Sequence, residues 1–222
     1  GLGWRQALLY APLKLAYRID DRDVLRARNT RAPVVYAVVH QSRLDPALML
    51  ALLPEQTLHI LDEHSARTGW LEPFRELART IAFNPKHVFV SRRLVSQLKG
   101  GGRLAVYLPA KIEPDVRNYR LFRAVAHIAA RADARIVPVV VGGARSLPFS
   151  LTSSARAPRR LWPRLTIRAA EGQTLKQLMD TAGVAASTLS NALFDRIAET
   201  RMASLRPERP LFLAVRDAAD AL

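Results

Sequence analysis

Two residues five positions apart, His40 and Asp45, have side chains that could act together in proton transfer. The apolar run "PVVYAVV" leads into His40, and a second apolar run, "DPALMLALL", begins at Asp45. A neutral imidazole can remove the proton of an attacking hydroxyl, while a neighbouring carboxylate orients the ring and stabilises the imidazolium that forms. Such a pair needs neither a Ser or Cys nucleophile nor a metal ion.

The same two residues also have a purely structural interpretation. Asp45 precedes Pro46, and an acceptor side chain followed by Pro is a strong helix start. Asp45 would then be an N-cap, and His40 would simply end a strand. The spacing alone leaves both interpretations open, because isolated motif matches have a high false-positive rate.

The composition removes several other kinds of chemistry. The 222 residues include no Cys, which excludes disulfides, thiolate catalysis and Cys-based zinc sites, and which fits a reducing cytoplasmic setting. The five His residues form no His-Glu-x-x-His or comparable ligand pattern with the carboxylates. We therefore expect neither a metal nor a cofactor.

The net charge of +15 predicts an acidic partner, because a field of this strength concentrates polyanions around the protein. The 34 Lys and Arg residues are spread over most of the chain, without zinc-finger spacing, an RNA-binding signature or a long basic arm. We therefore expect no nucleic-acid partner, which leaves an anionic membrane and an acidic carrier protein. No stretch approaches the ~20 apolar residues that span a bilayer.

The first segment, residues 1–20, predicts an amphipathic helix. Its composition is typical of a helix that lies at a lipid interface. A terminal helix that docks on the protein core would have the same pattern, so both placements stay open. The apolar positions are Trp4, Leu8, Leu9, Leu13 and Tyr17, and the basic positions among them are Arg5, Lys14 and Arg18.

Between residues 21 and 173 predicted strands and helices alternate, which favours an α/β domain with a mostly parallel sheet flanked by helices. The Gly100–Gly102 triplet follows a helix and precedes a strand, the reverse of a phosphate loop, so it is interpreted as a flexible C-cap. The predicted strands cover residues 33–39, 57–61, 87–90, 103–108, 135–141 and 164–170, and the predicted helices cover 45–53, 69–81, 91–99 and 119–132.

Residues 174–222 predict a helical tail, because their apolar segments are not separated by strands. The last predicted helix reaches the final residue without a C-cap, which indicates a longer parent chain that leads into a further domain.

The stretch "HQSRLD" resembles the signature of the glycerolipid acyltransferase family, which includes lysophosphatidic acid acyltransferases: His, four residues and Asp, with Ser42 two places after the His. The order of later segments is similar over roughly residues 30 to 170. "RLVSQLKGGGRLAVYLPAKI" occupies the place of the helix, turn and strand that lead into the family's Pro-Glu-Gly motif, and "RIVPVVVGGAR" resembles its Val-Ile-Pro-Val block.

The chain departs from the family pattern at several positions. Val39 stands where members usually have Asn, and Asn84 stands where they have Asp before a Pro. The Pro-Glu-Gly-Arg stretch, which the family associates with the acceptor phosphate, is replaced by the four residues from Leu108 to Lys111. The Glu is lost, and only a positive charge survives, as a flexible point charge in place of a planar fork.

The resemblance implies an acyltransferase of the lysophospholipid or 1-acylglycerol-3-phosphate type with an altered acceptor motif, working as a peripheral protein at the cytoplasmic face of the inner membrane. His40 would be the general base and Asp45 its orienter. The donor would be acyl-coenzyme A or acyl-acyl carrier protein, and the acceptor a lysophospholipid. The residues expected to bind substrate are Ser42, Arg43, Asn84, Tyr107, Pro109, Ala110 and Lys111.

Three alternatives stay open at this point. Arg43 is equally consistent with a solvated turn, and Tyr107 with a core position. The altered motif also fits a protein that has kept the fold but lost catalysis, and that serves as a lipid-binding or membrane-docking module. The intact His–Asp spacing argues against that module.

Overall fold

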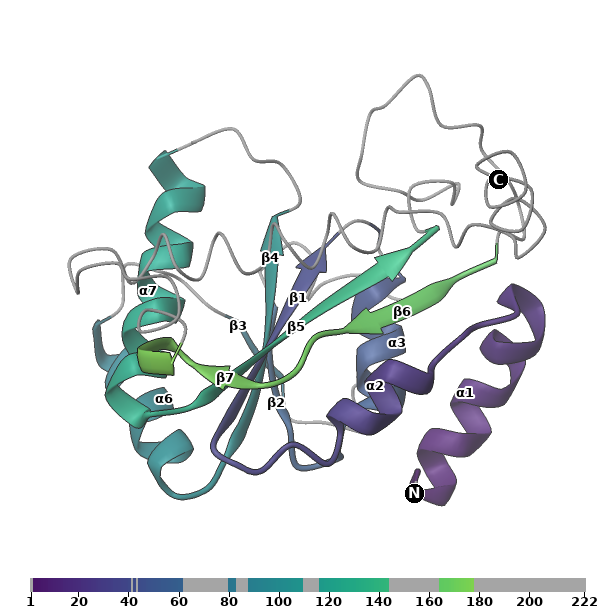
Figure 1. Cartoon of the computed structure of the whole chain (residues 1–222), viewed down its shortest axis with the longest axis horizontal. Coiled ribbons are helices and arrows are strands. Elements are labelled where there is room, and N and C mark those ends of the chain that lie inside the picture. The colour runs from purple at the N-terminus through teal and green to yellow at the C-terminus, as the bar shows by residue number, and fades with distance from the viewer. Residues whose placement is uncertain are drawn as a thin grey trace, which may run out of the picture.

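A mixed β-sheet forms the centre of the computed structural model, which describes residues 2–40, 42, 44–61, 80–82, 88–109, 116–143 and 164–177 (Figure 1). Within these residues the strand order is β3-β2-β4-β1-β5-β6, and β7 pairs with β5. Strands β1 to β5 are parallel, and β6 and β7 are antiparallel to β5. The strands are β1 (Val34–His40), β2 (Leu58–Leu61), β3 (Thr80–Ala82), β4 (Arg103–Pro109), β5 (Arg135–Gly142), β6 (Thr166–Ala169) and β7 (Gln173–Thr174).

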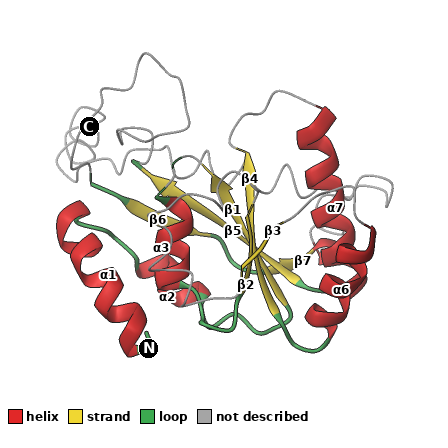
Figure 2. Cartoon of the chain, turned by 180° about the vertical axis from the view of Figure 1, so that it is seen from behind, coloured by secondary structure: helices red, strands yellow, loops and turns green. Residues whose placement is uncertain are grey.

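Helices cover both faces of this sheet, which confirms the predicted α/β class. Figures 1 and 2 show α1, α2 and α3 on one side and α6 and α7 on the other. In the part of the chain that the structure describes, none of the helices has the length and apolar character needed to cross a membrane. The helices are α1 (Trp4–Tyr17), α2 (Arg22–Ala27), α3 (Asp45–Leu52), α6 (Val88–Lys99) and α7 (Val116–Ala132).

The central strands are apolar on both sides because each side packs against helices. In β1, Tyr36 and Val38 belong to the core shared with α1 and α3, whereas Ala37 and Val39 belong to the core shared with α6 and α7. This double burial explains why "PVVYAVV" shows no alternation of apolar and polar residues.

One predicted element was wrong, and a second was wrong at its end. Residues 88–90 of "HVFV" form the first turn of α6, although their β-branched and aromatic side chains favour a strand. The helix predicted over 69–81 fails at its end, because Thr80 and Ile81 belong to β3, and residues 69–79 lie outside the described residues. The predicted C-cap is confirmed: Gly101 has a φ of 83°, and a Cβ on Gly102 would lie 2.5 Å from the Gln97 carbonyl oxygen.

The inner side of α1 docks on the protein, so the core-docking alternative for this helix holds on that side. The buried Gln6 amide donates to the carbonyl oxygens of Leu50 and Leu53 at 3.2 and 2.6 Å. The buried Tyr10 hydroxyl donates to Asp21 Oδ2 at 2.6 Å, and Lys14 Nζ lies 3.1 Å from the same oxygen. These contacts hold α1 against the end of α3 and the start of α2.

The outer side of α1 is apolar as well. Trp4, Leu8 and Leu15 are 74%, 68% and 82% exposed, and they are the exposed large hydrophobic residues of the described chain. Their spacing of four and seven places them on one face of the helix. Three basic residues, Arg5, Lys14 and Arg18, are also in or next to α1. One side of the helix is therefore covered by the protein, and the other side is apolar and exposed.

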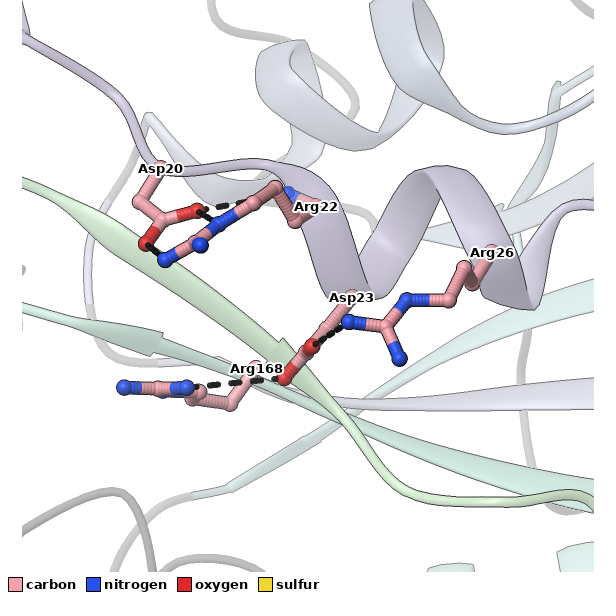
Figure 3. Close-up of polar contacts among 5 residues, drawn as sticks. All are labelled: Asp20, Arg22, Asp23, Arg26 and Arg168. Carbon is pink, nitrogen blue, oxygen red and sulfur yellow. Dashed lines mark hydrogen bonds and ion pairs between the residues drawn. The ribbon is translucent and has the colours of Figure 1, made fainter.

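A group of surface ion pairs joins α2 to β6 (Figure 3). Arg22 donates to both carboxylate oxygens of Asp20, from Nε at 3.0 Å and from Nη2 at 2.8 Å. Asp23 lies 3.4 Å from Arg26 and 3.8 Å from Arg168 on β6. The hydrogen bonds from Arg22 hold the pKa of Asp20 at about 2, below its ordinary value.

Candidate active site

The turn from β1 to α3 brings the predicted pair to the carboxyl edge of the sheet, where ligands of open α/β folds gather. The backbone of His40 ends β1 and pairs in register with Pro109, the last residue of β4. Asp45 is the first residue of α3, and its side chain is fully buried. The structure describes only the backbone of His40, so the expected contact between its imidazole and Asp45 stays a prediction.

The Asp45 carboxylate is held by Ser42 and does not cap the helix. The Ser42 backbone N–H donates to Asp45 Oδ2 at 2.8 Å, and the Ser42 hydroxyl donates to Oδ1 at 2.9 Å. The N-cap position belongs to Leu44, and α3 has no side-chain capping bond. The carboxylate therefore faces back into the turn, towards the segment that contains His40, and the interpretation of Asp45 as an N-cap is wrong.

Ser42 is fully buried, and its hydroxyl both donates to Asp45 and accepts the Leu44 N–H at 3.3 Å. The Asp45 N–H in turn donates to the Ser42 carbonyl at 3.3 Å. A buried carboxylate is costly unless hydrogen bonds compensate its charge, and Ser42 supplies two of them. These contacts give Ser42 a role in orienting Asp45, while its expected contact with substrate stays a prediction.

Tyr107 lies on β4, where its backbone pairs with Val38 of β1, and its partly buried ring packs against the core shared with α3. Its hydroxyl oxygen lies 2.8 Å from Nδ1 of His59 on β2. Burial, and to a smaller extent the negative charge of Asp45, raise the pKa of Tyr107 well above its ordinary value. The phenol is therefore protonated at neutral pH and acts as a hydrogen-bond donor or acceptor near the carboxylate.

His59 is a polar residue of this region that the sequence-based list of site residues missed. It is 1% exposed, and burial lowers its pKa to about 3. A signal was present in "TLHIL", where a histidine interrupts a short apolar strand between Leu58 and Ile60. A buried polar residue in such a strand needs a partner, but the sequence does not show that the partner is Tyr107.

The remaining predicted substrate contacts are only partly placed. Pro109, the second residue of the altered motif, is at the end of β4, beside the backbone of His40. Arg43, Asn84, Ala110 and Lys111 lie outside the described residues. Among the residues that the structure does describe, no three His, Asp or Glu side chains come together in a way that could hold a metal ion.

Comparisons with known proteins agree with this fold. A family model described as Acyltransferase matches residues 18–142, which include the β1–α3 turn and end with β5. The crystal structure of the 1-acyl-sn-glycerophosphate (LPA) acyltransferase PlsC from Thermotoga maritima is similar to this chain, with a TM-score of 0.56 and 15% sequence identity. The similarity covers 92% of this chain and 82% of that one, and it establishes a shared fold.

Proposed function

Because the chain belongs to the acyltransferase family, we propose that it moves a fatty acyl group from an acyl thioester to the hydroxyl of a lysophospholipid or related glycerolipid at a membrane surface. One observation carries the proposal: a fully buried Asp45 carboxylate, held by two hydrogen bonds from Ser42, begins α3 five residues after the end of β1 at His40. A carboxylate oriented in this way suits the support of a catalytic imidazole.

In the proposed mechanism His40 is the general base. It removes the proton of the acceptor hydroxyl as that oxygen attacks the thioester carbonyl. Asp45 fixes the orientation of the imidazole and stabilises the imidazolium. A new C–O ester bond forms, the C–S bond breaks, and the imidazolium returns its proton to the departing thiolate. Ser42 keeps the carboxylate in place throughout.

The acceptor site follows from the position of the altered motif. Pro109 pairs with His40 along neighbouring parallel strands, so the residues that follow Pro109 begin at the same edge as the proposed base. We assign the acceptor head group to this edge, with Lys111 and Arg43 as its cationic contacts and Asn84, Tyr107 and Ala110 in the lining. The loss of the family's Glu and Gly is then a change of acceptor.

For the donor, a further resemblance supports a carrier protein. "RRLWPRLTIRAAEG" and "RPLFLAVRDAADAL" resemble the segments that approach the synthetase domain of the bifunctional 2-acyl-glycerophosphoethanolamine acyltransferase/acyl-acyl carrier protein synthetase. An acidic carrier protein suits a chain with a net charge of +15. Acyl-acyl carrier protein is therefore the first donor to test, with acyl-coenzyme A second.

The outer face of α1 is the proposed membrane contact. Trp4, Leu8 and Leu15 form an exposed apolar face on a helix that is held firmly on its other side, and basic residues accompany it. Interfacial helices combine these two features. We place the protein peripherally at the cytoplasmic face of the inner membrane, where each Lys or Arg near anionic lipid adds about 1 kcal/mol.

The test of the function is an incubation of the purified protein with a radiolabelled acyl thioester and a panel of lysophospholipids, followed by separation of the lipids. The expected product is a labelled diacyl lipid from at least one acceptor. Reactions without acceptor measure thioester hydrolysis. A folded protein that labels no lipid with either donor would contradict the proposal.

The altered motif favours one alternative function, a non-catalytic module that binds lipid through the same fold. That module would bind vesicles without turnover. The membrane contact can be tested for both functions with a triple variant in which Trp4, Leu8 and Leu15 are each changed to Ser. Sedimentation of this variant with anionic vesicles should fall while the fold is kept. Arg93→Ser on α6 is the control, because it removes an exposed charge elsewhere and should leave sedimentation nearly unchanged.

A further inference from the structure

The hydrogen bond between His59 and Tyr107 connects the interior of the sheet with the proposed active site. His59 sits on β2 opposite Ala105 of β4, and Tyr107 is two residues further towards the carboxyl end of β4. The two rings are stacked, with centroids 6.2 Å apart and planes at 26°. The pair therefore lies directly below the edge where β1 and β4 end at His40 and Pro109.

Burial of the polar His59 side chain costs free energy at a position that an apolar residue could fill. Its neighbours along β2, Leu58 and Ile60, turn into the apolar core beneath α6 and α7. His59 alternates with them and belongs to the opposite side, which α3 covers. A buried imidazole loses its hydration and must be compensated by hydrogen bonds. The partner here is the Tyr107 hydroxyl, and the two residues form a buried polar pair on the side of the sheet that carries Asp45.

The charge states of the two residues limit what the hydrogen bond can be. Burial lowers the pKa of His59 to about 3, so the ring is neutral at physiological pH and carries one N–H. Burial and the Asp45 charge raise the pKa of Tyr107, so its hydroxyl keeps its proton. Two arrangements remain: Nδ1–H donates to the Tyr107 oxygen, or the Tyr107 O–H donates to Nδ1.

We infer that His59 is a positioning residue for the acyl transfer proposed above: its Nδ1–H donates to the Tyr107 oxygen and so turns the Tyr107 O–H away from His59, on the side of the sheet that carries Asp45. The opposite arrangement would use the only phenolic proton on His59, and Tyr107 would have no proton to donate towards the proposed active site. In the arrangement that we assign, the Tyr107 O–H is a donor on the active-site side of the sheet, while Ser42 holds the Asp45 carboxylate from the turn. This inference rests on the proposed function.

The kinetic test compares His59→Leu, His59→Asn and Tyr107→Phe. Loss of one hydrogen bond corresponds to roughly a tenfold lower kcat, which we expect for both His59→Leu and Tyr107→Phe. For His59→Leu, which does not line the acceptor site, KM should be nearly unchanged. The double variant His59→Leu with Tyr107→Phe should lose no more kcat than either single variant, because both residues act through the Tyr107 hydroxyl. His59→Asn should recover much of the rate, since its amide N–H stands close to the place of Nδ1–H.

Tyr36→Phe is the matched control. Tyr36 also has a buried hydroxyl, which donates to the Ala27 carbonyl at 3.2 Å and accepts from Arg103 at 2.8 Å, but it lies towards the amino end of β1. The same change of Tyr to Phe should therefore leave kcat unaltered. A purely structural His59 would give His59→Leu a lower melting temperature with an unchanged kcat per folded molecule, and this result would overturn the inference.

The tautomer provides a readout that does not depend on turnover. In protein labelled with ¹⁵N-histidine, the His59 signals should report a neutral ring protonated at Nδ1, and they should shift in Tyr107→Phe. A ring protonated only at Nε2 would overturn the inference even in an active enzyme. A wild-type chain that transfers no acyl group would overturn the proposed function as well, whereas an active wild type with fully active His59→Leu would overturn the inference alone.

Discussion

The two faces of the sheet are built from different kinds of residue. On the side of α6 and α7 the described core is a continuous apolar cluster that includes Leu94, Leu98 and Val125. On the side of α1 and α3 the apolar core also surrounds polar groups that are bonded to each other or to the backbone, among them Gln6, Asp45 and His59. The two faces of the sheet therefore differ in role. The face under α6 and α7 stabilises the fold through apolar packing, while the face under α1 and α3 also holds buried polar groups, which lower stability.

The largest expected effect concerns the polar face. His40→Ala and Asp45→Asn should each lower kcat by about 10²- to 10⁴-fold, the usual contribution of general acid–base catalysis. Circular dichroism and the melting temperature should change little for His40→Ala. Asp45→Asn keeps the size of the side chain and an acceptor for the Ser42 N–H, but removes the negative charge. Wild-type activity in Asp45→Asn would show that the carboxylate serves the structure alone.

The apolar face should give the opposite result. Leu98 on α6 is fully buried, and truncation of a buried Leu costs about 2–5 kcal/mol of unfolding free energy. Leu98→Ala should therefore lower the midpoint of urea unfolding clearly, while kcat per folded molecule stays at the wild-type value. A large fall in kcat at a temperature where the variant is folded would mean that the two faces are not separate.

A pH series gives a third comparison, centred on His59. Its pKa falls from 6.5 to about 3 on folding, so the unfolded chain binds the proton more readily. The stabilisation of the neutral ring is complete above pH 6.5 and is lost as the pH falls towards 3. Wild type should lose stability relative to His59→Leu by about 1.4 kcal/mol per pH unit in this window.

Urea titrations of both proteins at several pH values measure this difference. The carboxylates, including Asp45, and the hydroxyl of Tyr107 are common to the two proteins, so their titration largely cancels. Parallel curves for wild type and His59→Leu would contradict a buried neutral imidazole.

The smallest effect belongs to the surface ion pairs of α2. Arg22 is 73% exposed, and exposed pairs contribute about 0.2–1 kcal/mol, so Arg22→Ala should cost no more than that at pH 7. Because the pKa of Asp20 is lowered from 3.8 to about 2, the contribution is complete above pH 4 and disappears as the pH falls through 2. Thermal melts at pH 7 and 2.5 should show the difference shrink, and an equal cost at both would exclude the ion pair as its source.

Much of the fold could be predicted because local rules and tertiary packing agree. The apolar runs of β1, β4 and β5 are typical of strands covered on both faces, and Pro46 marks the start of α3. The residues 88–90 show where agreement fails. Their β-branched and aromatic side chains favour a strand, but these residues form the start of α6, so local propensity alone does not decide their structure.

The candidate site could be predicted in its residue types but not in its contacts. The spacing of His40 and Asp45 indicated the chemistry, and the short turn that contains Ser42 was visible in "HQSRLD". The direction of the Asp45 carboxylate could not be predicted, because the sequence is the same whether Asp45 caps the helix or accepts hydrogen bonds from Ser42. The His59–Tyr107 bond joins residues 48 positions apart, and only the order of β2 and β4 in the sheet brings them together.

The hydrogen bonds from Gln6 to Leu50 and Leu53 give α3 a second structural role, as the connection between α1 and Asp45. Asp45 is at one end of this eight-residue helix, and α1 is fastened at the other. At 1.5 Å per residue the helix is about 12 Å long, so it acts as a ruler between the two. With α1 resting on a bilayer, α3 would fix how far Asp45 lies from the membrane contact, and this distance would limit which acceptor hydroxyls can reach the proposed site.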